Sequence, residues 1–473
     1  MDYKEIFSIL LFLSINKSSL AAKILCISSP HVGHVFPIVQ AGKVLQTKYN
    51  HTFTVVGDHH LISNPLMANS GVSLIESKRL NEQNFEARAE EVLKIQAEGQ
   101  APLFKLAGMF TDMCIAILED DDLIELLKRH KYDVMITLTS FIGDCLNFVA
   151  YKLSLPIVHY GNLFDGYSFG IPVNPSVTPI FPVANYGESM SFRQRVLNNI
   201  AFYAKIFVSN LLIRSDISNV YVPEKPYISP KDLRRHVQLT LMDFDVLMDY
   251  PRPSMPNTVF VGGLNTAPPA QKLDADFQSI MDSATDGIVV VSFGSVFKSF
   301  PHGKLDIIFQ AMRKVKSVKF VMKYGKEAIQ DANIHLRPWL PQNELLAHKN
   351  TKAFITHCGN SGQYEALYNA VPMIDVTING DQFYNAERMR LKGYGLYTSL
   401  LSINVDSLAA MIEEVVKNPS YKDKILKASE IFKSRPGGIP SERAAYWVDH
   451  VIKYGGEYMH SIGTELPWYI ISD

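Results

Sequence analysis

The sequence predicts an α/β protein made of two doubly wound domains, each with its own parallel sheet. Three observations lead to this prediction. The chain has 473 residues, which exceeds the length of one ordinary domain. Short apolar runs alternate with stretches of helical periodicity in both halves, as is typical of parallel sheets covered by helices. A proline-rich stretch, residues 251–271, separates the halves and predicts a linker.

The first domain is expected over residues 23–250, and its strands are short apolar runs. We expect them at residues 23–28, 53–57, 73–77, 133–137 and 156–160. A loop at residues 29–34 should follow the first strand, and a helix should open at Pro37, because proline is favoured in a first helical turn. Further helices are expected over residues 101–130 and 143–152.

Three features of the first half bear on function. An acidic run, residues 119–122, contains the D-x-D pattern of some metal sites. A D-x-D metal site needs a strand-end loop, whereas this run falls inside the predicted helix 101–130, so it predicts a solvated helix surface. The Pro- and Gly-rich residues 161–188 predict long loops that suit a variable acceptor pocket. Residues 191–214 predict an amphipathic helix packed against its own domain, with contact to a membrane surface as the alternative. Its apolar residues lie three and four positions apart: Phe192, Val196, Ile200, Tyr203 and Phe207.

The second domain is expected over residues 272–434 and repeats the alternation of strands and helices. Its predicted strands are residues 288–293, 318–324, 352–357 and 371–376. Two helices, residues 304–313 and 407–417, carry apolar side chains on one side, which should face the sheet.

The start of the chain, residues 1–22, predicts a secretory signal peptide. Its apolar run, residues 6–15, is too short to span a membrane and is followed by small residues. We therefore expect the endoplasmic reticulum lumen or secretion as the location. Four scattered cysteines without a C-x-x-C pair predict buried thiols and no disulfide framework: Cys26, Cys114, Cys145 and Cys358. The formal net charge of −1 gives no reason to expect a nucleic acid as partner.

Residues 339–382 carry the groups that predict a nucleotide-binding site. An apolar strand ends at His357, and the small-residue elbow 358–362 leads into a helix. Free backbone N–H groups and the helix dipole make such an elbow an anion site. Glu365, one turn into the helix, suits the vicinal hydroxyls of a ribose. A flat aromatic face, two amides and a carboxylate complete the set: Trp339, Gln342, Gln382 and Asp381.

The spacing of these groups resembles the donor-binding signature of the UDP-glycosyltransferase family, which reads W-x-P-Q, T-H-x-G, E-A, P-M and D-Q. The resemblance covers most of residues 23–473. It implies the GT-B fold, in which two Rossmann-like domains face each other across a cleft, and residues 435–473 form a closing helix that returns to the first domain. Ligands in such sheets bind beyond the carboxyl ends of the strands, so the acceptor and the catalytic base should come from the first domain.

The resemblance also implies contacts to the base, the ribose and the sugar of a UDP-sugar donor. Trp339 would stack on uracil, and Gln342 with Glu365 would bind the ribose. Asp381 and Gln382 would hold the transferred sugar, and this pair suits glucose, glucuronate or galactose equally well. The variable loops would form the acceptor pocket, so the resemblance does not specify the acceptor.

The diphosphate contacts implied by the resemblance come from Ser295, His357 and the helix start. That start is formed by Gly359, Ser361 and Gly362. A helix N-terminus stabilises the leaving diphosphate without a metal, so no metal and no cofactor are expected. Ser361 replaces an asparagine of the family pattern, and Gly362 replaces a phosphate-binding hydroxyl residue.

His34 lies in G-H-x-x-P and matches the family's catalytic histidine. An imidazole with an ordinary pKa near about 6.5 is suited to taking the proton of an acceptor hydroxyl at neutral pH. The aspartate that commonly orients this histidine aligns with Leu138, so another carboxylate would have to serve. Asp144 is the preferred candidate and Asp165 the alternative. Thr377 is a further departure, because a proline is usual there.

The predicted function is an inverting UDP-glycosyltransferase that moves glucose or glucuronate to a hydroxyl of a small lipophilic acceptor. The alternative is a weak or inactive family member that binds UDP-sugars or apolar ligands. A GT-B epimerase or phosphorylase is disfavoured by the complete spacing from Trp339 to Gln382. The chain ends at Asp473, where membrane-bound members enter a C-terminal span, so we expect either a lumenal protein or one anchored by a span missing from this chain. The sequence leaves the oligomeric state open.

Overall fold

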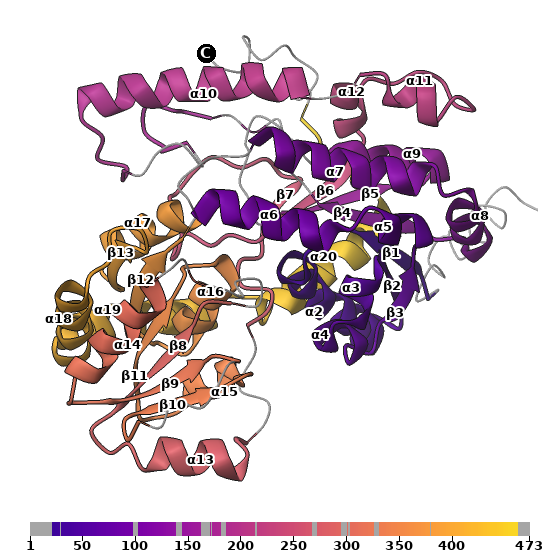
Figure 1. Ribbon diagram of the computed structural model, residues 1–473. Coiled ribbons are helices and arrows are strands. Elements are labelled where there is room, and N and C mark those ends of the chain that lie inside the picture. The colour runs from indigo at the N-terminus through magenta and orange to yellow at the C-terminus, as the bar shows by residue number, and fades with distance from the viewer. Residues whose placement is uncertain are drawn as a thin grey trace, which may run out of the picture.

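The structure, a computed structural model, contains two α/β domains that follow one another along the chain (Figure 1). It describes residues 21–28, 30–97, 103–138, 144–161, 171, 173–180, 186–212, 215–266, 272–294, 300, 303–325, 331–378 and 380–461. Each domain has one parallel sheet with helices packed against it, so the predicted fold class is confirmed.

The first domain is built on seven parallel strands in the order β3-β2-β1-β4-β5-β6-β7. This is the doubly wound order, in which the chain starts mid-sheet and later reverses its direction across it. The strands are β1 (Lys23–Ile27), β2 (Thr52–Gly57), β3 (Ser73–Glu76), β4 (Val134–Leu138), β5 (Ile157–Gly161), β6 (Val237–Met242) and β7 (Thr258–Phe260). The strands predicted from apolar runs are confirmed. β6 and β7 are additional, and β7 lies inside the stretch expected as a linker.

Helices cover both faces of this sheet, because alternate side chains of a strand point to opposite faces. Leu25 and Ile27 of β1 pack with α7 and α9, whereas Ile24 and Cys26 pack with α2 and α20. The helical segments are α2 (Val32–Tyr49), α3 (His59–Ser63), α4 (Pro65–Ala68), α5 (Lys78–Glu82), α6 (Phe85–Ala97), α7 (Leu103–Leu118), α8 (Asp121–His130), η1 (Asp144–Leu146), α9 (Asn147–Leu153), α10 (Phe192–Leu212), α11 (Ile217–Tyr221) and α12 (Pro230–Arg234).

Helix α2 begins at Val32, so the prediction that it opens at Pro37 is wrong. The His31 carbonyl accepts from the backbone N–H of His34 at 3.0 Å and of Val35 at 3.3 Å, and these bonds start the helix earlier. Proline is favoured in the first turn of a helix, but here one further helical turn precedes Pro37. As a result, His34 lies in the first turn of a helix rather than in a loop.

The helix predicted over residues 101–130 is two helices, and the acidic run marks the break between them. Asp120 is the N-cap of α8, and its carboxylate accepts from Leu123 N at 3.0 Å. It also accepts from Ser77 Oγ at 2.9 Å, and it is buried. The run is therefore a capped helix start. Asp120 has a structural role, while Asp121 and Asp122 are exposed.

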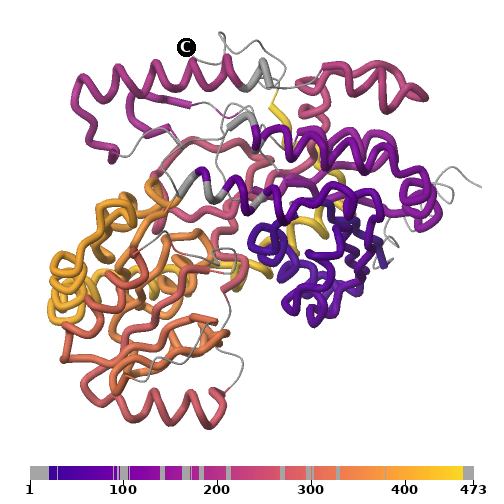
Figure 2. Tube along the Cα trace, viewed as in Figure 1, coloured from indigo at the N-terminus to yellow at the C-terminus, as the bar shows by residue number. Residues whose placement is uncertain are grey.

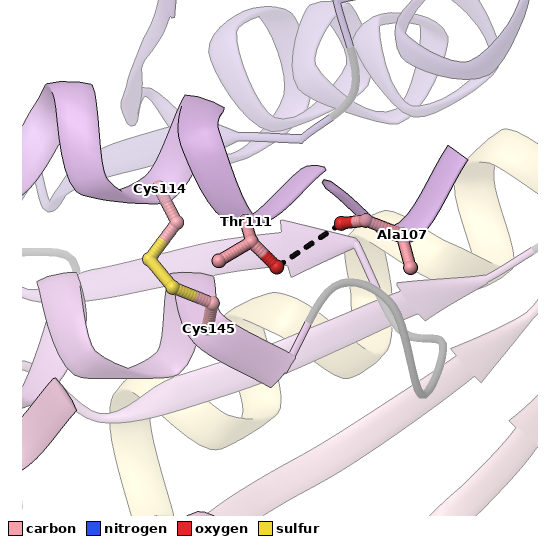
Figure 3. The surroundings of a disulfide bond; sticks show 4 residues. All are labelled: Ala107, Thr111, Cys114 and Cys145. Atoms are coloured by element: carbon pink, nitrogen blue, oxygen red, sulfur yellow. Dashed lines mark hydrogen bonds between the residues drawn. A yellow bond between two sulfur atoms is a disulfide. The ribbon is translucent and has the colours of Figure 1, made fainter. Parts of the chain in front are cut away.

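Cys114 of α7 and Cys145 of η1 form a disulfide, so the expectation of unpaired thiols is wrong for this pair (Figure 3). Their Cα atoms lie 5.8 Å apart although 31 positions separate them in the sequence. The packing of α7 over the end of β4 brings them together, and spacing rules do not capture such a contact. Cys26 and Cys358 are buried free thiols, as expected.

The second domain has six parallel strands in the order β10-β9-β8-β11-β12-β13. They are β8 (Ile288–Ser292), β9 (Lys319–Lys323), β10 (Ile334–Arg337), β11 (Thr351–Thr356), β12 (Met373–Thr377) and β13 (Gly395–Ser399). Ile288 and Val290 of β8 belong to one apolar cluster, and Val289 and Val291 belong to the cluster on the other face. The helical segments are α13 (Ala275–Asp282), α14 (Lys304–Lys314), α15 (Gln342–Ala347), α16 (Asn360–Tyr368), α17 (Gln382–Lys392), α18 (Val405–Lys417), α19 (Pro419–Lys433), α20 (Pro440–Tyr454) and η2 (Glu457–Met459).

Helix α20 leaves the second domain and packs on the first, as the yellow end of the tube shows in Figure 2. Ala444, Ala445 and Val448 belong to the same apolar cluster as β1 and α2. Asp449 accepts from His51 Nε2 at 3.0 Å, because His51 Nδ1 already accepts from the N–H of Ala22 at 3.1 Å. Among the helices in the described part of the chain, none combines the length and apolar character needed to cross a bilayer.

Candidate active site

His34 stands just beyond the carboxyl end of β1, in the first turn of α2. Burial lowers the pKa of its imidazole below the ordinary value, and the Asp381 carboxylate of the second domain opposes this shift. His31 lies beside it, with ring centroids 5.9 Å apart in an edge-to-face arrangement. Burial, followed by the charges of His34 and His60, lowers the pKa of His31 to about 3. Both imidazoles are therefore neutral at pH 7, and a neutral imidazole is able to accept a proton.

Asp144, the predicted partner of His34, forms a buried ion pair with Arg234 of α12. The 3-10 turn that starts at Asp144 directs this carboxylate toward α12, and the adjacent Cys145 disulfide anchors the turn to α7. An aspartate that neutralises a buried guanidinium has a structural role of its own. Its assignment to His34 stays a prediction. Leu138 is buried at the end of β4, and Asp165 lies outside the described residues.

His357 follows β11 and lies between two glycines. A Cβ atom on Gly294 would stand 2.8 Å from its Cε1, and one on Gly359 would stand 2.6 Å from its Nε2. Any larger residue at either position would displace the imidazole. Its Nδ1 lies 3.5 Å from Thr356 Oγ1. Burial, and secondly the charge of Lys323, lower the pKa of His357 to about 4, so it is a neutral hydrogen-bonding group at pH 7.

The elbow after His357 leads directly into α16, whose N-cap is Gly359. Ser361 and Gly362 lie in the first turn, where backbone N–H groups lack partners within the helix. This confirms the strand, elbow and helix expected for an anion site. Cys358 has φ +67°, in the left-handed region of backbone conformation. Its thiol donates to Asp375 Oδ2 at 2.6 Å, and this hydrogen bond stabilises the conformation of the elbow. Ser295 lies outside the described residues.

Lys323 is a site residue that sequence reasoning missed. It ends β9, and its ammonium group donates to Gly294 O at 3.0 Å. The same nitrogen lies 4.5 Å from the centre of the Trp339 ring, and its charge acts on His357. A lysine at the carboxyl end of a parallel strand was the available signal, because ligands bind at that edge. The structure thus adds a cation between the aromatic face and the predicted phosphate site.

Glu365 and Gln342 lie together, as the ribose prediction requires. Gln342 Nε2 donates to Glu365 Oε2 at 2.5 Å, and Asn265 Nδ2 donates to Oε1 at 2.8 Å. Burial raises the pKa of Glu365 to about 7, against the effect of these two hydrogen bonds. Asn265 comes from the segment that joins the domains and was not predicted. Trp339 is 51% exposed, so a face remains accessible to a planar base.

Asp381 and Gln382 begin α17, whose N-terminus faces the first domain. Asp381 Oδ2 accepts from Asn385 Nδ2 at 2.8 Å, and burial raises its pKa while the charge of His34 opposes the increase. Gln382 Oε1 accepts from Ile378 N at 2.7 Å, which fixes the turn before the helix. The predicted sugar-binding carboxylate and the predicted base therefore act on each other across the two domains.

Asp243 holds the two domains together beneath the donor site. It follows β6, and its carboxylate accepts from Tyr160 O–H at 3.1 Å and from Gly263 N at 2.6 Å. Asn360, the first residue of α16, donates to its backbone oxygen at 3.2 Å. Burial raises the pKa of Asp243 to about 6. Within the described residues, no cluster of three His, Cys, Asp or Glu side chains could hold a metal ion.

Two Rossmann-type domains, with a strand, a tight elbow and a helix start at the middle of the second sheet, define the class of GT-B glycosyltransferases. Solved structures share this fold. The glycotransferase of kitacinnamycin is 16% identical with a TM-score of 0.64, covering 91% of this chain and 99% of its own. A Phytolacca americana UGT2, complexed with UDP-2fluoro-glucose and pterostilbene, is 16% identical with a TM-score of 0.61 over the same shares.

Sequence comparison identifies the family. A model of the UDP-glucoronosyl and UDP-glucosyl transferase family matches residues 60–471, and the chain belongs to this family. Mouse UDP-glucuronosyltransferase 1-2 is 31% identical over 81% of this chain and 72% of its own length. Human UDP-glucuronosyltransferase 1A3 is 32% identical over 80% of this chain and 72% of its own length. The protein is thus a UDP-dependent glycosyltransferase.

Proposed function

We propose that the protein transfers glucose or glucuronate from a UDP-sugar to a hydroxyl group of a small lipophilic acceptor, with inversion at the sugar C1. The closeness of His34, in the first turn of α2, to Asp381, the N-cap of α17, carries this proposal, because each group acts on the pKa of the other. It pairs a neutral histidine of the first domain with the carboxylate that we propose holds the sugar on the second domain. Support for the acceptor class comes from a relative in fold, whose described complex contains UDP-2fluoro-glucose and pterostilbene.

In the proposed reaction, His34 takes the proton of the acceptor hydroxyl while that oxygen bonds to the sugar C1. The bond from C1 to the UDP oxygen breaks on the opposite side, and UDP leaves with the bonding electrons. Attack opposite the leaving group inverts the configuration. A neutral imidazole is the required form of the base, and the Asp381 charge favours the imidazolium that follows.

The protein would hold the donor at its base, its ribose and its diphosphate. Trp339 would stack on uracil. Glu365 would accept hydrogen bonds from the ribose hydroxyls, and Gln342 would donate one to them. The first turn of α16, His357 and Lys323 would stabilise the diphosphate as its negative charge grows. Because helix dipole and ammonium charge already act there, we propose that the reaction needs no divalent metal.

The location we propose is the secretory pathway. The Cys114–Cys145 disulfide supports it, because disulfides persist in oxidising compartments and are rare in the cytosol. The predicted signal peptide, residues 1–20 in particular, lies outside the described residues. Signal cleavage is checked by N-terminal sequencing of the secreted or lumenal protein.

The decisive experiment incubates the protein with radiolabelled UDP-glucose, UDP-glucuronate or UDP-galactose and a panel of phenols and sterols. We expect transfer from UDP-glucose or UDP-glucuronate, a β-linked product by NMR, and no loss of rate with EDTA. A product with retained configuration would refute the mechanism, and a rate restored only by magnesium or manganese would refute the metal-free site. UDP binding without transfer to any acceptor would support the inactive, ligand-binding alternative.

A further inference from the structure

Asn385 of α17 joins the part of the candidate donor site assigned to the sugar to the part assigned to the diphosphate. Its Nδ2 atom donates to Asp381 Oδ2 at 2.8 Å, and it donates to the carbonyl oxygen of Cys358, in the elbow, at 3.0 Å. The side chain is buried, with 3% of its surface exposed. Both hydrogens of the amide are therefore used, one by the carboxylate that we propose holds the sugar and one by the elbow.

Arg388, three positions further along α17, fixes the orientation of this amide. Its Nη2 atom donates to Asn385 Oδ1. A guanidinium group has only donors, so the amide must turn its oxygen to Arg388 and its nitrogen to Asp381 and Cys358. Arg388 is 1% exposed, and its Cζ atom lies 4.7 Å from the centre of the Tyr384 ring. Packing and hydrogen bonding together hold the guanidinium group in place.

Arg388 also adds a positive charge that its own ion pair does not neutralise. Its Nη1 atom lies 2.8 Å from Asp249 Oδ1, and Arg252 Nη2 lies 2.5 Å from the same oxygen. Two guanidinium groups thus share one carboxylate, which leaves one positive charge in excess. Burial raises the pKa of the Asp381 carboxyl, and the charge of Arg388 is among the effects that oppose this increase. The excess charge therefore favours the ionised form of Asp381.

The same ion pair ties α17 to the first domain. Asp249 lies in the segment between β6 and β7, which belong to the sheet of the domain that contains His34. We propose that Asn385 and Arg388 are positioning residues for glycosyl transfer. Arg388 orients the Asn385 amide, and this amide holds the Asp381 carboxylate in the orientation that binds the sugar and at a fixed place relative to the elbow. This inference rests on the proposed role of Asp381.

Arg388→Met tests the inference without leaving a buried charge unpaired, because Asp249 keeps Arg252 as its partner. Titration calorimetry on the full chain compares UDP, which has no sugar, with UDP-glucose and UDP-glucuronate. Affinity for the UDP-sugar that the parent binds more tightly should fall about tenfold, because the hydrogen bond to a charged carboxylate is lost. Affinity for UDP should stay within about twofold, because the hydrogen bond between the Cys358 thiol and Asp375 still holds the elbow.

A double-mutant cycle shows whether Arg388 acts through Asp381. Asp381→Asn alone should weaken UDP-sugar binding, and adding Arg388→Met should then cause less than about a twofold further loss, because linked residues are not additive. Additive losses would overturn the inference. The matched control is Arg390→Met on the same helix, where Arg390 pairs with Glu387 at 2.8 Å. It should bind UDP and UDP-sugars like the parent.

Asn385→Asp is a second variant, which keeps the shape of the side chain and its bond with Arg388. Its carboxylate neutralises the excess charge but has no hydrogen to donate to Asp381 or Cys358. We expect a thermal unfolding temperature close to that of the parent and a loss of UDP-sugar affinity of at least about tenfold. Should Arg388→Met fail to fold, this variant decides the question.

The pattern of results separates this inference from the proposed function. Parent-like UDP-sugar binding in Arg388→Met or Asn385→Asp, together with weakened binding in Asp381→Asn, would refute the positioning role and leave the sugar site standing. Parent-like binding in Asp381→Asn would refute the proposed sugar site and this inference with it. An equal loss for UDP and UDP-sugar in Arg388→Met would mean that Arg388 supports the fold of the whole donor site, which also contradicts the inference.

Discussion

Replacing Lys323 by glutamine tests the phosphate site with little change in shape. The ammonium group of Lys323 donates to Gly294 O at 3.0 Å and lies 4.5 Å from the Trp339 ring centre. The amide of Lys323→Gln still donates a hydrogen bond but carries no charge. A hydrogen bond to a charged group contributes roughly 1.5–3 kcal/mol, so UDP should bind about tenfold to a hundredfold more weakly. Isothermal titration calorimetry measures the change.

The control for this variant lies on the same strand. Lys319 is at the amino end of β9 and donates to Ser283 Oγ at 3.0 Å, so Lys319→Gln should bind UDP like the parent. Uridine, which has no diphosphate, should bind Lys323→Gln with little change. Because the Lys323 charge helps to lower the pKa of His357, NMR titration should show that pKa rising above its value of about 4 in Lys323→Gln. Equal losses for UDP and uridine would refute a phosphate role.

His34→Ala should reduce the transfer rate by a factor on the order of 10² to 10⁴ with UDP affinity unchanged, as initial rates and calorimetry will show. Asp144→Ala should lower the free energy of unfolding by roughly 3–5 kcal/mol in chemical denaturation, because it removes the carboxylate that neutralises buried Arg234. Unchanged stability together with a lost transfer rate would instead make Asp144 the partner of His34. Uridine affinity should fall as pH decreases through about 7, where Glu365 gains a proton, and Glu365→Gln should give a flat profile. Burial raises the pKa of Asp375 from 3.8 to about 7. The protonated carboxyl therefore contributes its full stability below pH 3.8, and this contribution is lost as pH rises through about 7. Denaturation curves measured across this pH range should show that Asp375→Asn lacks the loss.

The strands and the donor elbow were predictable because their signals are local. A run such as residues 352–357 contains its own evidence of burial, and the small residues after His357 specify a turn. The donor groups from Trp339 to Gln382 follow from one spacing pattern, since strand, elbow and helix have fixed lengths, and the structure describes them. Ser295 lies outside this pattern and outside the described residues.

The remaining features depend on which distant segments meet. Arg234 reaches Asp144, and Cys114 reaches Cys145, only because the sheet brings α12 and α7 to the same edge. Lys323 becomes a site residue only because β9 lies beside β8 and the turn at Gly294. For α10 the sequence contains two apolar sides, one with Phe202 and one with Phe207, and periodicity does not say which one packs.

Because α20 packs on the first domain, the core of that domain is completed only after the second domain has been synthesised. Ala444 and Val448 complete a core whose other members lie in β1 and α2, at the opposite end of the chain. During translation, the apolar side chains of the first domain that pack against α20 therefore stay uncovered until α20 has been synthesised. We expect the first half expressed alone to aggregate or to be retained by chaperones. Exchanges of halves between relatives should yield folded hybrids only when residues 440–454 travel with the first half.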